Sequence, residues 1–244
     1  MLKILKSVRS IELKITVPLT EQRRILEAIG LDPVEAEPRE AFFFDTPDLA
    51  LNRAGLIVRA RRFPEGRADT VVKLRPVEPT TVDPDMRRSD AFKLEIDVMP
   101  GGFVCSASFK GVCGSQEVSR AASGSMPLRK LFSKEQRAYY AAHAPKGLTM
   151  DKLVVLGPTF LLKARHQPKE FDRRITIELW LYPDGTRILE ISTKSLPEEA
   201  FKVAAEFRAY LGSCGVVSVG DQSAKTRSSL AFFTRRLKTA KRKR

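Results

Sequence analysis

The sequence has little that would place the protein in a membrane, in an oxidising compartment or around a zinc ion. None of its 244 residues belongs to an apolar run near the ~18 residues that a membrane span needs. Residues 1–10 lack an apolar core followed by a cleavage site, so we expect no signal peptide. Three cysteines and two histidines are too few for a disulfide framework or a three-histidine zinc site. These absences predict a cytoplasmic protein with no membrane partner.

The chain also lacks a G-x-x-x-x-G-K-[ST] loop, which excludes a Walker-type nucleotide site. Positive charge, by contrast, is in excess, since 43 Lys and Arg against 29 Asp and Glu give a formal net charge of +14. Residues 235–244 hold seven basic residues and no acid. We expect this segment to be a solvated tail, and nonspecific contact with nucleic acid is a secondary interpretation. The excess on the remaining residues indicates an anionic partner.

Eight segments alternate apolar and polar residues, which is the period of a β-strand. A Tyr182-Pro183-Asp184-Gly185 turn joins the last two of them. Helices are predicted over 21–29, with Thr20 as its cap, over 128–142, over 196–211, capped by Ser195, and over 223–237. Residues 99–125 are rich in Gly and Ser and indicate a loop. The predicted strands are 8–17, 39–45, 55–62, 70–75, 91–98, 153–165, 172–181 and 186–194.

Seven of these eight segments carry charged residues on one face and bulky apolar residues on the other, as where Arg59 and Arg61 alternate with Val58 and Ala60. An antiparallel sheet with a solvated outer face would explain the pattern. A closed barrel with its charged faces inward would explain it too, and it would leave room for one small ligand. We favour the barrel because bulky apolar faces suit packing against outer helices. The predicted fold is α+β, an eight-stranded antiparallel barrel (tunnel) with helices packed outside.

A barrel interior lined by Arg and Lys would repel itself unless anions balanced it. Arg makes forked contacts with phosphate and Lys supplies point charges, so the pattern predicts a ligand with several phosphates. The carboxylates on the same faces would repel phosphate unless they held a divalent metal that bridges to it. These carboxylates are Glu12, Glu95, Asp97, Glu178 and Glu190.

In this order and spacing, the motifs resemble the CYTH family of triphosphate tunnel metalloenzymes, which includes inorganic triphosphatases, thiamine triphosphatases and class IV adenylate cyclases. The first strand of that family carries Glu-x-Glu-x-Lys, and the matching run here is Ser10-Ile11-Glu12-Leu13-Lys14. The most similar block spans residues 43–61. Further matches are Lys73-Leu74-Arg75, Glu95-Ile96-Asp97, Glu190-Ile191-Ser192 and the helix start around Lys225.

The resemblance implies a tunnel domain over residues 1–234, followed by the tail at 235–244. It implies a hydrolase, dependent on Mg²⁺ or Mn²⁺, that cleaves inorganic triphosphate or another triphosphate-bearing substrate. Glu12 and Glu190 would bind the metal, and Lys14 and Glu178 would complete the catalytic group. Glu95 and Asp97 would orient basic side chains or water. The residues expected to bind the triphosphate are Lys14, Arg59, Arg61, Lys73, Arg75, Arg165 and Lys225.

Three positions depart from the family pattern. Ser10 and Ser192 stand where a carboxylate is usual, and Trp180 lies near another such position. Because a hydroxyl is a poorer ligand than a carboxylate for a hard cation, we expect weaker metal affinity. Triphosphate binding should survive better than hydrolysis, so the alternative function is a catalytically weak or inactive module that binds polyphosphate or a nucleotide.

Two further predictions concern residues that we place outside the tunnel. Arg53 and Arg62 are expected to form solvent-facing ion pairs. Asp45 and Thr46 are expected to act in a turn or a helix cap.

Overall fold

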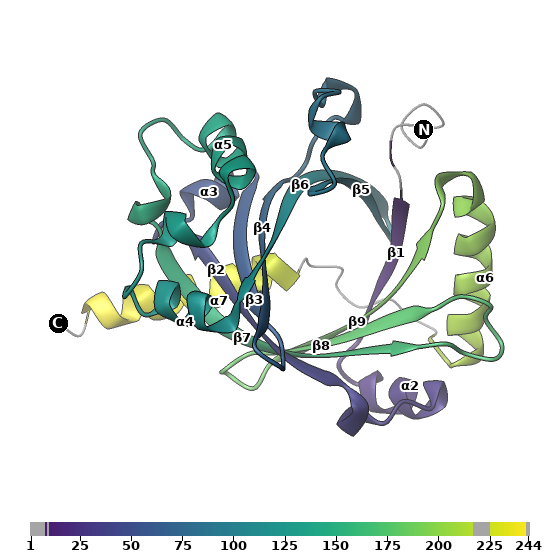
Figure 1. Ribbon diagram of the computed structural model, residues 1–244. Helices are drawn as coiled ribbons and strands as arrows, with labels where there is room; N and C mark the ends of the chain where they lie inside the picture. Colours follow the sequence, from purple (N-terminus) through teal and green to yellow (C-terminus); the bar gives the residue numbers. More distant parts are fainter. Residues whose placement is uncertain (1–7, 9, 217–224, 243–244) are drawn as a thin grey trace.

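The computed structural model describes residues 8, 10–216 and 225–242, and its centre is a closed β-barrel (Figure 1). The strands follow one another around the barrel in the order β1-β5-β6-β4-β3-β2-β7-β8-β9. All neighbouring pairs are antiparallel except β1 and β5, which run parallel. The strands are β1 (Ser10–Val17), β2 (Glu37–Asp45), β3 (Leu56–Arg62), β4 (Arg67–Leu74), β5 (Phe92–Met99), β6 (Gly102–Gly114), β7 (Val154–His166), β8 (Ile175–Leu181) and β9 (Arg187–Ser195).

The predicted strand number and direction were wrong, because the barrel is mixed and has nine strands. The missing strand is β6, which lies in the segment that we predicted to be a loop. Its inward residues include Ser106 and Ser108, and three glycines lie along its length. Small and flexible residues resemble loop composition, although the barrel interior accepts them. The parallel pair arises because closure places the first strand between β9 and β5.

Helices cover the outside of the barrel, with α2 and α6 on one side and α3, α4 and α5 on the opposite side (Figure 1). The helices are α2 (Gln22–Ile29), α3 (Ala50–Arg53), α4 (Ser115–Ala122), α5 (Lys134–His143), α6 (Ala200–Ser213) and α7 (Lys225–Arg242). Short 3-10 helices lie at Pro33–Glu35, Pro79–Thr81, Met86–Arg88, Leu128–Leu131, Met150–Lys152 and Pro197–Glu199. No helix among the described residues is long and apolar enough to span a membrane.

Local sequence signals predicted where the helices lie more accurately than they predicted the residue at which each helix begins. Glu21, not Thr20, precedes α2, and no side chain caps that helix. Ser195 donates to the carbonyl of Leu196 instead of capping α6, which begins only after the 3-10 turn at Pro197–Glu199. The predicted helix over 128–142 divides into a 3-10 turn and α5, because Ser133 caps α5 by accepting from the backbone of Gln136.

The main hydrophobic core lies between the outer faces of the strands and these helices. Ile11, Val58 and Ile177 all belong to it and are almost completely buried. Gln136 of α5 joins helix to sheet, because its amide donates to the carbonyls of Thr70 and Phe109. Since the apolar faces point outward to the helices, the charged faces must point into the barrel, which confirms the inward orientation that the alternation predicted.

A second apolar cluster packs α7 against inward-facing residues near one end of the barrel. Leu230 and Phe233 of α7 contact a cluster that includes Phe43, Leu161 and Trp180. Helix α7 continues across the expected boundary between residues 234 and 235. The division into a domain and a tail stays a prediction, as does contact of the tail with nucleic acid.

Candidate polyanion-binding tunnel

Strand alternation and register bring charged side chains from most strands into the barrel interior. Lys163 lies opposite Glu178, Arg61 opposite Asp69, and Glu178 opposite Glu190. The basic residues on this interior include Lys14, Arg39, Arg59, Arg61, Lys73, Arg75, Lys93, Lys110, Lys163, Lys194 and Lys225. Seven acidic residues accompany them, namely Glu12, Glu37, Asp69, Glu95, Asp97, Glu178 and Glu190. The described interior therefore has a formal excess of positive charge.

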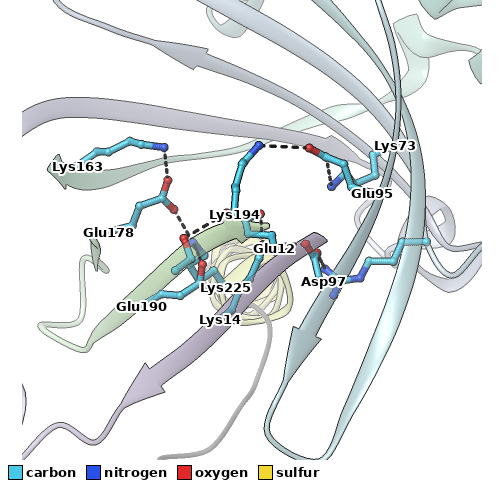
Figure 2. A network of polar contacts seen from close by, with 12 residues as sticks. Glu12, Lys14, Lys73, Glu95, Asp97, Lys163, Glu178, Glu190, Lys194 and Lys225 are labelled. Carbon is cyan, nitrogen blue, oxygen red and sulfur yellow. Dashed lines mark hydrogen bonds and ion pairs between the residues drawn. The ribbon is translucent and has the colours of Figure 1, made fainter. Parts of the chain in front are cut away.

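Lys225 lies between the acidic side chains of β8 and β9 and contacts both of them (Figure 2). Its ammonium donates to Glu178 Oε2 and to Glu190 Oε1, the latter at 2.7 Å. Lys163 Nζ lies 3.0 Å from Glu178 Oε1, and the Trp180 indole donates to Glu178 Oε2 at 3.2 Å. Burial opposes ionisation of Glu178, but Lys225 and Lys163 outweigh it and hold its pKa well below the usual value.

Lys14 has the same role between β1 and β5. Its ammonium lies 2.9 Å from Glu12 and 3.1 Å from Asp97, and Arg75 lies 3.4 Å from Asp97. Ser192 donates to Glu12 Oε1 at 3.2 Å. Burial opposes the charge of Lys14, but the surrounding carboxylates raise its pKa. On this side of the tunnel, as around Lys225, acids and cations are matched.

The side formed by β3, β4 and β6 differs, because several of its donors lack partners, although Arg61, Lys73 and Lys110 each pair with an acid. Among the described residues, Arg59 forms no ion pair, and its Nε has no hydrogen-bond partner. Burial and the neighbouring Arg61 lower the pKa of Arg59 to about 10. Burial likewise lowers the pKa of Lys73 to about 8, because its nearest carboxylate, Glu95, is 3.9 Å away. The free donors therefore gather on one side of the interior.

Two buried hydroxyls on β6 add to these unpartnered groups. The hydroxyls of Ser106 and Ser108 accept and donate no hydrogen bond within the described residues. The register places Ser108 between Lys73 on β4 and Lys93 on β5. A buried hydroxyl without a partner costs free energy that a ligand oxygen could recover.

Most of the expected site residues lie together in the structure. Arg61 pairs with Asp69, at 3.0 Å between Nε and Oδ1, and faces inward beside Arg59. Arg165 lies on the same face of β7 as Lys163, but it is exposed and forms no ion pair with any described residue, so its binding role stays a prediction. The other expected residues form three groups of ion pairs. Lys14 pairs with Glu12 and Asp97, which also contacts Arg75; Lys73 pairs with Glu95; and Lys225 pairs with Glu178 and Glu190. Figure 2 shows these groups close together. Their placement agrees with the predictions, but their roles stay predictions.

Sequence reasoning missed several interior residues. Lys163 and Lys194 had the right alternation but were not predicted as site residues, and they pair with Glu178 and Glu95, respectively. Lys110 lies on β6 and pairs with Glu95, so the loop prediction concealed it. The same prediction concealed the two serines. Asp69 preceded the predicted start of its strand, and Arg39 shared its face with apolar residues.

The predictions for residues outside the tunnel are confirmed. Arg53 pairs with Asp48 on the surface, and Arg62 pairs with Glu40 at 2.6 Å across two strands. Asp45 accepts from the backbone of Leu51 and Asn52, while Thr46 accepts from Ala50 at 2.8 Å. These bonds cap the short helix α3.

The expected metal ligands do not suit a shared divalent ion. Glu12 lies opposite Lys194 and Glu190 lies opposite Thr16, so the two acids are four residues apart along the strands. At a rise of ~3.3 Å per residue, this separates their Cα atoms by about 13 Å. Within the described part of the chain, no three His, Cys, Asp or Glu residues are placed to hold a metal ion. Glu12 and Glu190 are thus not placed to share one divalent ion, and metal dependence stays an untested prediction.

Comparison with known proteins supports the architecture. No family model matches the chain, and no curated protein matches its sequence. A candidate adenylyl cyclase from Hippeastrum, described as having a dominant triphosphatase activity, matches with a TM-score of 0.67 and 14% identity, over 91% of this chain and 95% of that chain. A candidate adenylate cyclase from Bacillus halodurans matches with a TM-score of 0.63 and 15% identity, over 91% and 97% respectively.

At such identities the likeness concerns the fold. The closed barrel of this chain shares the fold of these structures. The chain has a CYTH-like fold, as the motifs had indicated.

Proposed function

We propose that the protein binds the triphosphate moiety of a small-molecule substrate inside the barrel. The observation that carries this proposal is the side of the interior formed by β3, β4 and β6. There Arg59 Nε and the hydroxyls of Ser106 and Ser108 have no hydrogen-bond partner among the described residues, and Lys73 has a long ion pair with Glu95 at 3.9 Å. A polyanion would supply the missing acceptors and offset the excess charge. Water alone would satisfy the hydroxyls but would not neutralise the cations.

Arginine and lysine side chains in the barrel can contact the phosphates in two different ways. Arg59 and Arg61 lie two residues apart on one strand and can make forked contacts with adjacent phosphates. Lys73 adds a compact charge on the neighbouring strand. A hydrogen bond that involves a charged group contributes about 1.5–3 kcal/mol, so a few such contacts suffice for specific binding.

Hydrolysis of the terminal phosphoanhydride is the second candidate function, and the triphosphatase activity ascribed to the Hippeastrum protein favours it. Glu12 and Glu178 are each held by lysine in the described geometry. A phosphate chain that drew Lys14 away would release Glu12 to orient or deprotonate water. Glu190 and Lys225 complete this proposed catalytic group. Dependence of the reaction on Mg²⁺ or Mn²⁺ is a separate proposal.

Calorimetric titration with inorganic triphosphate in the presence of a chelator tests binding, and phosphate release with and without Mg²⁺ or Mn²⁺ tests hydrolysis on the same sample. We expect binding in the chelator. Metal-dependent release that is lost in Glu12→Gln and Glu190→Gln would establish the metal-dependent hydrolase. Binding without release would establish the binding module, and absence of both would refute the proposed function.

A further inference from the structure

Two carboxylates stand side by side inside the barrel. Glu178 on β8 and Glu190 on β9 are directly opposite in the register, and both side chains face inward. Only 12% of each side chain is exposed, so solvent screens their repulsion poorly. Like charges directly opposite one another on adjacent strands destabilise a sheet. The pair therefore requires a cation beside it.

Lys225 supplies that cation and is held in position at both ends. Its ammonium bonds both carboxylates and lies 5.2 Å from the Trp180 ring centroid, while 14% of the side chain is exposed. At its backbone, the Tyr182 hydroxyl donates to the Lys225 carbonyl at 3.2 Å. Leu230 and Phe233 anchor the same helix in the apolar cluster described above.

We infer that the Lys225 ammonium is the resident cation of the Glu178–Glu190 pair, in the place that a divalent metal would otherwise take. A metal ion entering there would have to displace the ammonium, break both of its bonds and leave a buried charge unpaired. Because Lys225 is part of helix α7, its ammonium has a high effective concentration at the two carboxylates. Free metal ions must compete with it for the same position. This inference concerns the acidic side of the tunnel and does not rest on triphosphate binding.

The test removes the ammonium and asks whether Mn²⁺ then binds. We expect Lys225→Met to lower the melting temperature, and added Mn²⁺ to restore part of the loss and to bind in calorimetry. The wild-type protein should show neither effect. Lys163→Met is the matched control, since it removes the other lysine on Glu178 but leaves Lys225 between the two acids. It should gain no Mn²⁺ binding.

A double variant keeps the test decisive if Lys225→Met alone does not fold. Lys225→Met with Glu190→Gln removes both the cation and the repulsion, so it should fold and should not gain Mn²⁺ binding. Two results would overturn the inference. One is Mn²⁺ binding by the wild-type protein that disappears in Glu190→Gln, and the other is a folded Lys225→Met that binds no Mn²⁺. Triphosphate titration of the same samples is scored separately, so failure of the proposed function would leave this result standing.

Discussion

Replacing Arg59 by methionine should make the protein more stable while weakening its hold on triphosphate. Arg59 is a partly buried cation that forms no ion pair with a described residue, and its Nε lacks a hydrogen-bond partner. A group arranged in this way costs stability in the absence of its ligand. Natural binding sites often keep such strained groups because function depends on them.

The cost follows from the pKa of Arg59, which burial and Arg61 lower from 12.5 to about 10. For a base whose pKa is lower in the folded state, the charged form is disfavoured on folding, and at neutral pH the full difference opposes stability. This difference corresponds to at most about 3 kcal/mol. Because Arg59 keeps some contact with solvent, we expect a gain of about 1–2 kcal/mol, which is about 3–6 °C in melting temperature for a chain of this size.

The same substitution removes one or two charged hydrogen bonds to phosphate. At about 1.5–3 kcal/mol for such a contact, affinity for inorganic triphosphate should fall roughly 10- to 150-fold. Methionine is of comparable length and apolar, so the neighbouring strands keep their packing. Stability and affinity should therefore move in opposite directions.

Thermal unfolding without ligand and calorimetric titration with triphosphate measure the two effects. Arg62→Met is the matched control, because Arg62 follows on the same strand but pairs with Glu40 outside the tunnel. It should leave affinity unchanged and reduce stability by no more than about 1 kcal/mol. If Arg59→Met lost stability, or bound triphosphate as the wild type does, Arg59 would not be the poised cation that we describe.

Three further predictions follow from the same geometry. Lys73 carries its charge below a pKa of about 8 and loses it above, so triphosphate affinity should fall about tenfold from pH 7 to pH 9. Lys73→Arg should abolish that fall, and an unchanged pH profile in this variant would contradict the role of Lys73. Gln136→Leu leaves two buried carbonyls without donors and should cost about 2–4 kcal/mol in chemical denaturation; a loss typical of a surface position would contradict the bridging role. Triphosphate affinity in a chelator should match or exceed that in Mg²⁺, since the metal neutralises part of the anion, and loss of binding in the chelator would refute this.

The alternation of residues along the strands was enough to predict the inward charged face. Val58 and Ala60 pack outside while Arg59 and Arg61 face inward, because side-chain direction on a strand is a local property of the backbone. The preference of Asp for turns and helix caps predicted the role of Asp45. Its carboxylate accepts from backbone groups only six and seven residues away. Such interactions depend on near neighbours in the chain, so sequence reveals them.

Strand β6 shows where local reasoning ends. Its small and flexible residues resemble a loop, and only closure of the barrel between β4 and β5 makes them a strand. The parallel contact of β1 with β5 has the same origin, since no local signal records which strands become neighbours.

The sequence by itself determined that the alternating strands would present their cations to the interior of a barrel. The tertiary structure alone decided which of those cations are free. Lys225 is 35 residues from Glu190 and 47 from Glu178 in the chain, yet its ammonium donates hydrogen bonds to both carboxylates. Arg59 is left without an ion pair among the described residues, and its Nε has no hydrogen-bond partner. Pairing of charges depends on distances across the barrel, which become defined only when the chain folds.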